Sequence, residues 1–331
     1  MIRDKLMQCL KIIIPLMLGM IILYFLYAKT DFGQLWTSIL ETNWTVLTCS
    51  LIFGLSGNLI RGMRWDLLIR PLGYRPRKSN LIYAVLGNYA VNFALPRAGE
   101  IWRCGVVAKK EKIPLVKLIG TLIVDRLFDM LMVALIFLLA ISVNAKVFYR
   151  NMHEFNLPSF LVSPSFYGIL ALLLLLAVST LMFFRKNFIV RKILSFFVSL
   201  WKDLLQIRRM EHKMRFVGYT LGIWISYFLY FYITFYAFDF TAELGLAAGI
   251  FVFAVSSLSM GIPSNGGLGP WQAAIVFGLL AFRIDLIQAK TFATVVFTYQ
   301  SLWTVLCGLF GIAMFSIRNG RTNKLSQDNI S

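Results

Sequence analysis

Apolar runs of 18 to 28 residues, each long enough to cross a lipid bilayer, recur along this chain. A helix needs about 20 apolar residues to span the hydrocarbon core, and inside lipid a helix satisfies its own backbone groups. With 59% apolar and only 15% charged residues, the chain cannot make a polar surface, which excludes a water-soluble globule. The sequence predicts an all-α polytopic membrane protein. We expect six full transmembrane helices, at residues 10–28, 45–62, 116–143, 162–184, 216–238 and 291–317.

The placement of the basic residues predicts how these spans are oriented. Lys and Arg collect in the cytoplasmic loops of membrane proteins. Lys and Arg gather in the segments 61–80, 97–117 and 185–215, in residues 1–11 and in the tail after 317. Together these hold 27 of the 33 basic residues and only 7 of the 15 acidic ones. We therefore expect these segments and both termini in the cytoplasm. Topology then explains the net charge of +18, and no nucleic-acid partner is expected.

Two further apolar stretches, 79–95 and 244–262, each lie between two loops of similar charge. The loops around 79–95 are both basic, and those around 244–262 are both poor in positive charge. If both flanking loops are on one side of the membrane, the stretch between them cannot cross and stay across. Each stretch is interrupted by Pro and Gly, at 96–99 and 261–270, and a shorter apolar piece follows. We expect two re-entrant hairpins that enter from opposite faces. The alternative is eight spans with two kinked helices.

The order span, span, hairpin, span occurs twice, which predicts an inverted repeat within a single membrane domain, 1–331. Its halves are 1–143 and 144–317, followed by a cytoplasmic tail at 318–331. Within the second half, 188–207 shows one polar stripe on a mostly apolar helix, which is typical of an amphipathic helix lying at the interface. Transporters built from inverted repeats bind substrate where their broken helices meet.

Three charged residues, Asp125, Arg126 and Asp129, lie inside a predicted span. A charge in the bilayer costs about 2.5–3.5 kcal/mol on insertion scales, so each is a candidate for function. Arg126 and Asp129 are three residues apart and can meet on one helix face. The cluster either neutralises itself to position the helix, or its carboxylates hold an arginine that points into a cavity.

The first break carries Asn92, Arg97, Glu100 and Arg103. A helix that begins at a hairpin tip directs unpaired N–H groups and a partial positive charge toward the membrane interior. Arginines beside such a terminus favour a phosphate or another anionic head group. Alternatively, Arg97 and Arg103 reach water and pair with Glu100.

The second break is uncharged, and Ser264, Asn265, Gly266 and Gly267 leave its backbone accessible. Such a turn can form an anion-binding nest. The glycines could equally serve close helix packing.

Arg61 and Arg64 lie at the cytoplasmic end of the second predicted span, where they either anchor the helix at the interface or form an entry vestibule for a head group. The four cysteines show no paired spacing, and His153 and His212 are far apart in the sequence. No metal site, cofactor or catalytic motif is expected.

Four motifs follow one another along the chain: Arg61-x-x-Arg64-Trp65, Asn92-x-x-x-Pro96-Arg97-Ala98-Gly99-Glu100-x-x-Arg103, Asp125-Arg126-x-x-Asp129 and Pro263-x-x-Gly266-Gly267-Leu268-Gly269. In this order the chain resembles the flippase-like transmembrane region of lysylphosphatidylglycerol synthases, a region found also as a stand-alone bacterial and archaeal membrane protein. Asp125 stands where that family often has Glu, and Gln272 where an acidic residue is common. The aminoacyl-transferase domain of the synthases is missing from these 331 residues, so lipid synthesis by that route is not expected.

The resemblance implies a lipid flippase or transporter of the bacterial inner membrane, and not an enzyme. Its substrate would be an anionic or aminoacylated phospholipid or a polyprenyl-linked lipid, moved between leaflets. A membrane-embedded enzyme that transfers a group on a lipid phosphate, and a scaffold for envelope assembly, are the alternatives. The predicted head-group site comprises Asn92, Arg97, Arg103, Arg126, Ser264, Asn265, Gly266 and Gly267, with Glu100, Asp125 and Asp129 as supporting carboxylates.

Overall fold

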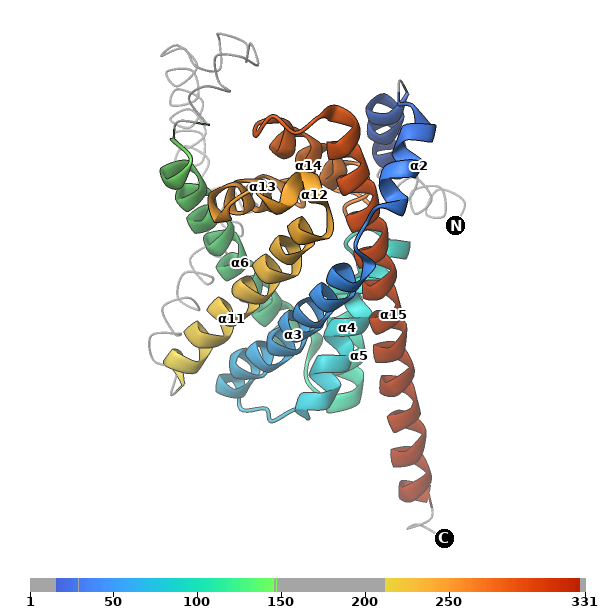
Figure 1. The fold of residues 1–331 in the computed structure, drawn as a ribbon. Helices are drawn as coiled ribbons and strands as arrows, with labels where there is room; N and C mark the ends of the chain where they lie inside the picture. Colours follow the sequence, from blue (N-terminus) through green and yellow to red (C-terminus); the bar gives the residue numbers. More distant parts are fainter. Residues whose placement is uncertain (1–15, 29, 146, 148–211, 328–331) are drawn as a thin grey trace, which may run out of the picture. The chain divides into compact units, whose positions relative to one another are not determined.

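The computed structural model describes residues 16–28, 30–145, 147 and 212–327 (Figure 1). The chain divides into two compact units, one made of 1–143 and 214–331 and the other of 144–213. The predicted span at 162–184 and the predicted interfacial helix at 188–207 lie outside the described residues. Everything below concerns the first unit, whose described regular structure is helical.

Four of the described helices are long and apolar enough to cross a membrane, which confirms a multi-pass membrane protein. They match four of the predicted spans, with boundaries that differ from the predicted ones by up to ten residues. These helices are α3 (Trp44–Ile69, continued by η1, Arg70–Leu72), α6 (Leu115–Val143), α11 (Lys213–Tyr232, continued by η3, Ile233–Ala237) and α15 (Leu286–Gln327, apolar through Ile317).

The N-terminal region contains two short helices. The first, Leu16–Tyr27, is apolar and lies within the predicted span at 10–28, whereas the second was not predicted. The second is α2 (Phe32–Leu40), which begins where the Asp31 side chain accepts hydrogen bonds from the backbone N–H groups of the first turn. Since α2 is only nine residues long, it carries no bilayer-length signal.

The first predicted break separates two antiparallel helices, α4 (Lys78–Ala94) and α5 (Ala98–Glu111). At their open end, Asn80 Nδ2 donates to Glu111 Oε1 at 2.5 Å. Near the turn, Gly99 lies so close to the backbone carbonyl of Asn88 that a side chain at position 99 would clash with it. The pair is therefore a tight helical hairpin closed by Leu95, Pro96 and Arg97.

The second predicted break also separates a helical hairpin. Its arms are α13 (Leu246–Ser259), which follows the short α12 (Asp239–Ala242), and α14 (Pro270–Leu280). Gly278 of α14 packs against Val252 of α13. Proline at the first position of α14 suits a helix start, where its missing N–H costs nothing.

The two hairpins meet tip to tip. Arg97 Nη2 donates to the carbonyl of Gly261 at 2.7 Å, and Asn265 Nδ2 donates to the carbonyl of Phe93 at 3.2 Å. Gly266 adopts φ +60°, and a Cβ there would lie 2.5 Å from the Phe93 ring. The sequence breaks therefore bring residues about 170 positions apart into direct contact.

Aromatic rings hold the surrounding helices in place. Phe231 and Phe235, at the end of α11 and in η3, contact Phe253 of α13 and Phe292 of α15 at centroid distances of 5.9 and 5.4 Å. All four side chains are largely buried. These contacts fix the end of α11 and η3 against α13 and α15.

Candidate functional site

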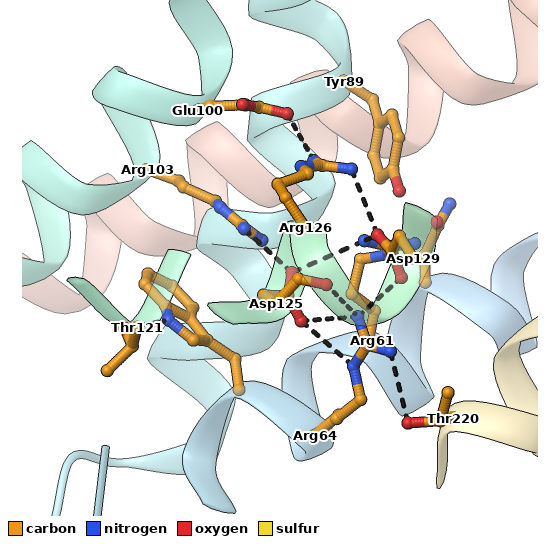
Figure 2. Close-up of polar contacts among 12 residues, drawn as sticks. Arg61, Arg64, Tyr89, Glu100, Arg103, Thr121, Asp125, Arg126, Asp129 and Thr220 are labelled. Carbon is orange, nitrogen blue, oxygen red and sulfur yellow. Dashed lines mark hydrogen bonds and ion pairs between the residues drawn. The ribbon is translucent and has the colours of Figure 1, made fainter. Parts of the chain in front are cut away.

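Seven charged side chains from α3, α5 and α6 form one cluster inside the helix bundle, and α4 and α11 add polar groups to it (Figure 2). The register of two helices explains why they meet. Asp125 and Asp129 are one turn apart on α6, and Arg61 and Arg64 are three residues apart on α3, so each pair lies on one helix face. We call these side chains the arginine–carboxylate cluster; its members are Arg61, Arg64, Glu100, Arg103, Asp125, Arg126 and Asp129.

Asp125 is the centre of the cluster and is completely buried. Its Oδ1 accepts hydrogen bonds from Arg64 Nη2 at 2.6 Å and Arg64 Nε at 3.0 Å. Its Oδ2 accepts from Arg103 Nη2 at 3.1 Å and lies 3.5 Å from Arg61 Nη1. One carboxylate thus binds three guanidinium groups.

Asp129 binds a second set of three arginines. Its Oδ2 accepts from Arg61 Nη1 at 2.6 Å and Arg126 Nη1 at 3.2 Å, and its Oδ1 accepts from Arg64 Nη2 at 2.8 Å. Arg61 and Arg64 therefore bridge the two aspartates, and charge-assisted bonds of this kind are the strong ones in proteins.

Arg103 is buried but not fully satisfied. Its guanidinium lies 4.7 Å from the centroid of the Trp65 ring, a cation–π contact, and the Trp65 indole N–H donates to Thr121 Oγ1. Of its nitrogens, Nη2 binds Asp125, whereas Nε and Nη1 have no hydrogen-bond partner among the described residues. Buried N–H groups are rarely left without a partner, so these donors are available to an acceptor that enters the site.

Hydroxyl groups of α4 and α11 complete the cluster. Arg61 Nε donates to the Tyr227 hydroxyl at 3.2 Å, and Tyr227 donates to Asn58 Oδ1 at 2.8 Å. The Tyr89 hydroxyl of α4 lies 3.0 Å from that of Tyr227, and Arg64 Nη1 donates to Thr220 Oγ1. The site therefore joins the two halves of the chain.

Arg126 and Glu100 form the accessible edge of the cluster. Arg126 Nη2 lies 2.5 Å from Glu100 Oε1, and the two side chains are 34% and 29% exposed. The Nε of Arg126 has no hydrogen-bond partner among the described residues. An incoming ligand would meet this ion pair first.

Among the described residues, the charges of the cluster do not balance. Four arginines face three carboxylates, which leaves one positive charge in excess in this part of the chain. A buried charge without a counterion is strongly unfavourable. A singly charged anion beside Arg103 and Arg126 would neutralise the site and use its free donors. Among the described residues no three His, Cys, Asp or Glu side chains are grouped to hold a metal ion.

Sequence comparison now places the chain among known proteins, because the profile of one family, the lysylphosphatidylglycerol synthase TM region, matches residues 12–308. The chain belongs to that family. A 76-residue segment is also 36% identical to glycosyltransferase AglD of Haloferax volcanii, a match that covers 23% of this chain and 12% of the relative. The match thus covers only about an eighth of that relative's length. No solved structure matches the chain. Family and relative together indicate a function connected with membrane lipids.

In this member of the lysylphosphatidylglycerol synthase transmembrane family, Arg61 and Arg64 are not where the sequence predicted them, at the membrane interface or in an entry vestibule. Both are buried in the arginine–carboxylate cluster, with 3% and 0% of their surface exposed, and not at an open vestibule or interface. The reason is that Asp125 and Asp129 of α6 pack directly against their helix. Glu100 likewise pairs with Arg126, and not with Arg103 on its own helix.

Some of the residues predicted to bind a head group instead hold the hairpin tips together, and others lie in the arginine–carboxylate cluster. Asn92 Oδ1 accepts from the Gly99 N–H at 2.9 Å, so it caps the start of α5, and Arg97 and Asn265 join the tips. Among the described residues Ser264 makes a long hydrogen bond, 3.4 Å, to the carbonyl of Ile262, and Gly266 and Gly267 both have positive φ. The arginines of the predicted site that gather in the cluster are Arg103 and Arg126.

Tyr89, Thr220 and Tyr227 were missed in the sequence analysis. Thr220 and Tyr227 are seven residues apart on α11, two turns of one helix face, and this polar pair in an apolar run was the available signal. Tyr89 carried no such signal, because an aromatic residue in a membrane helix is usually a packing residue.

Proposed function

We propose that this protein moves lipids with an anionic phosphate head group between the leaflets of the bacterial inner membrane, without changing them chemically. In this proposal the chain is a multi-pass protein with both termini in the cytoplasm, and its partner is the membrane lipid. The observation that carries the proposal is the excess positive charge of the buried cluster, together with the free N–H donors of Arg103 and Arg126.

The physical barrier to leaflet exchange is the cost of bringing a charged head group into hydrocarbon. A protein lowers that cost by replacing the water of the phosphate with preorganised donors. Guanidinium groups suit this task because their planar donors match phosphate oxygens in pairs. In the proposed mechanism the phosphate displaces Glu100 from Arg126 at the exposed edge, and Arg103 then supplies further donors from within.

The hairpins support a site midway across the bilayer. At about 1.5 Å per residue, α4, α5, α13 and α14 are roughly 26, 21, 21 and 17 Å long, shorter than a hydrocarbon core of about 30 Å. Arms of this length that meet at their tips fit two re-entrant hairpins entering from opposite faces, as in an inverted repeat. Transporters of that plan bind substrate where the broken helices meet.

Leaflet exchange in reconstituted vesicles tests the proposal. The probe is phosphatidylglycerol with a fluorescent acyl chain, and dithionite added outside bleaches only the label in the outer leaflet. Wild-type protein should expose the inner-leaflet label as well. Arg126→Ala should reduce exchange to the protein-free level, because the first phosphate contact is lost. Arg75→Ala, which removes an exposed arginine from the loop before α4, is the matched control and should exchange normally.

The lipid recovered after the assay separates transport from chemistry. Mass spectrometry should find the probe unchanged. A chemically altered probe would favour the membrane-enzyme alternative, and normal exchange by Arg126→Ala would show that the proposed site is not used.

A further inference from the structure

The first unit also has a groove, and no residue of the arginine–carboxylate cluster lines it. It has a volume of about 750 Å³ and is lined by one face of the helix Leu16–Tyr27, one face of α15, and residues of both hairpins. A volume of this size is in the range of about 300–1,000 Å³ that is typical of sites for small molecules.

The groove is long and mostly apolar. On α15 its lining residues recur at steps of three and four from Thr294 to Val305, which makes a face roughly 16 Å long. Leu23 of the N-terminal helix and Leu302 of α15 are among the apolar side chains that form its walls. Half of the bilayer hydrocarbon core is about 15 Å thick, so the groove is as long as one lipid chain within one leaflet.

The two ends of the groove differ. At one end the Tyr27 hydroxyl lies 2.5 Å from Thr294 Oγ1. Toward the other end, Gly19 packs so closely on the second hairpin tip that a Cβ would lie 2.7 Å from the carbonyl of Leu268. Phe93 of the first hairpin also lines the groove. The groove therefore leads from Tyr27 to the place where the hairpin tips meet.

A buried lysine lies beside the Tyr27 end. Lys290 is 5% exposed, its Nζ donates to Thr30 Oγ1 at 2.8 Å, and it lies 5.9 Å from the centroid of the Tyr27 ring. No acidic side chain among the described residues forms an ion pair with it. An ammonium group carries three donors, of which Thr30 takes one, so a negatively charged group at this end would be strongly favoured.

We infer that this groove is a second lipid site, which binds one hydrocarbon chain of an anionic phospholipid along α15 with the phosphate at Lys290. The inference rests on the proposed function, because it gives the transported lipid a second binding position, separate from the arginine–carboxylate cluster. The cationic end distinguishes the site from the general lipid contact of an apolar surface. Its other end, at Phe93 and Leu268, connects it to the hairpin tips.

Photolabelling of the intact protein in phosphatidylcholine nanodiscs tests the inference. The probes are phosphatidylglycerol and phosphatidylcholine, each with a diazirine on one acyl chain, and mass spectrometry locates the label. Phosphatidylglycerol should label residues 294–305 about tenfold more than phosphatidylcholine, the factor that corresponds to roughly 1.4 kcal/mol. Lys290→Gln should make the two probes equal.

A pair of tryptophan variants on α15 provides the steric test. Ser301→Trp fills the groove and should cut labelling of residues 294–305 about tenfold. Leu309→Trp adds the same ring at a position that is 54% exposed outside the groove, and should leave labelling unchanged. Equal labelling of wild type and Ser301→Trp, or no labelling because residues 1–15 or a second copy fill the groove, would overturn the inference.

The labelling experiment is independent of transport. Groove labelling without leaflet exchange would overturn the proposed function and leave the groove site intact. Leaflet exchange without groove labelling would overturn the groove site alone.

Discussion

At the scale of single residues, the cluster is held together by two aspartates that each bind three arginines. Part of this arrangement follows from spacing alone: Arg126 and Asp129 pair as their three-residue separation predicts. The partners of Asp125 could not be read in this way. Arg64 is 61 residues away, and only the packing of α3 against α6 brings the two together. Local spacing therefore identifies candidate charges, whereas the fold decides their pairing.

Asp125→Asn is expected to destabilise the protein by about 3–5 kcal/mol, because it leaves three buried guanidinium groups short of their shared carboxylate. Unfolding in mixed detergent micelles measures this change. Asp31→Asn is the control: it makes the same substitution at an exposed helix cap, where Asn caps as well as Asp. A loss of stability no greater than that of the control would contradict the central place given to Asp125.

Glu100→Gln is expected to slow leaflet exchange for a different reason from Arg126→Ala. The carboxylate of Glu100 competes with a phosphate for Arg126, so its removal should strengthen lipid binding and hinder release. Purified Glu100→Gln should therefore carry more phosphatidylglycerol than wild type, and Arg126→Ala less, as quantified by lipid mass spectrometry. Equal amounts in the two variants would argue against competition.

At the scale of helices, the two breaks were predictable from Pro and Gly, and the structure shows a helical hairpin at each. The sequence predicted that the hairpin tips meet, but not which atoms make the contact. Its chemistry, in which Arg97 bonds a backbone carbonyl, has no local sequence signal. The short helix α2 was missed because nine residues give no span-length run.

Two glycines on α5 test the hairpin directly. Gly99→Ala should destabilise the protein and reduce leaflet exchange, because its methyl group would clash with the Asn88 carbonyl and push α4 away from α5. Gly105→Ala changes the same helix where a Cβ meets nothing within 4 Å, and should stabilise it by about 0.5–1 kcal/mol. If the two variants unfold alike, the close packing of the hairpin is contradicted.

At the scale of the whole molecule, composition and the long apolar runs predicted a multi-pass membrane protein, which the helices confirm. The proposed inverted arrangement makes a prediction about sidedness. In a cysteine-free background, Lys78→Cys and Lys112→Cys at the base of the first hairpin should both react with an impermeant thiol reagent from the cytoplasmic side. Glu243→Cys and Arg283→Cys, flanking the second hairpin, should both react from the outside. Residues 78 and 112 reacting from opposite sides would instead support eight crossings.

The dependence of leaflet exchange on head-group charge tests the central claim most directly. Vesicles of one composition contain wild-type protein and a trace of acyl-labelled phosphatidylglycerol or phosphatidylcholine, whose labels and chains are identical. Because the described part of the cluster holds four arginines and only three carboxylates, exchange of phosphatidylglycerol should be faster by about tenfold, the factor that corresponds to roughly 1.4 kcal/mol. Equal exchange of the two lipids, or none above protein-free vesicles, would contradict the account.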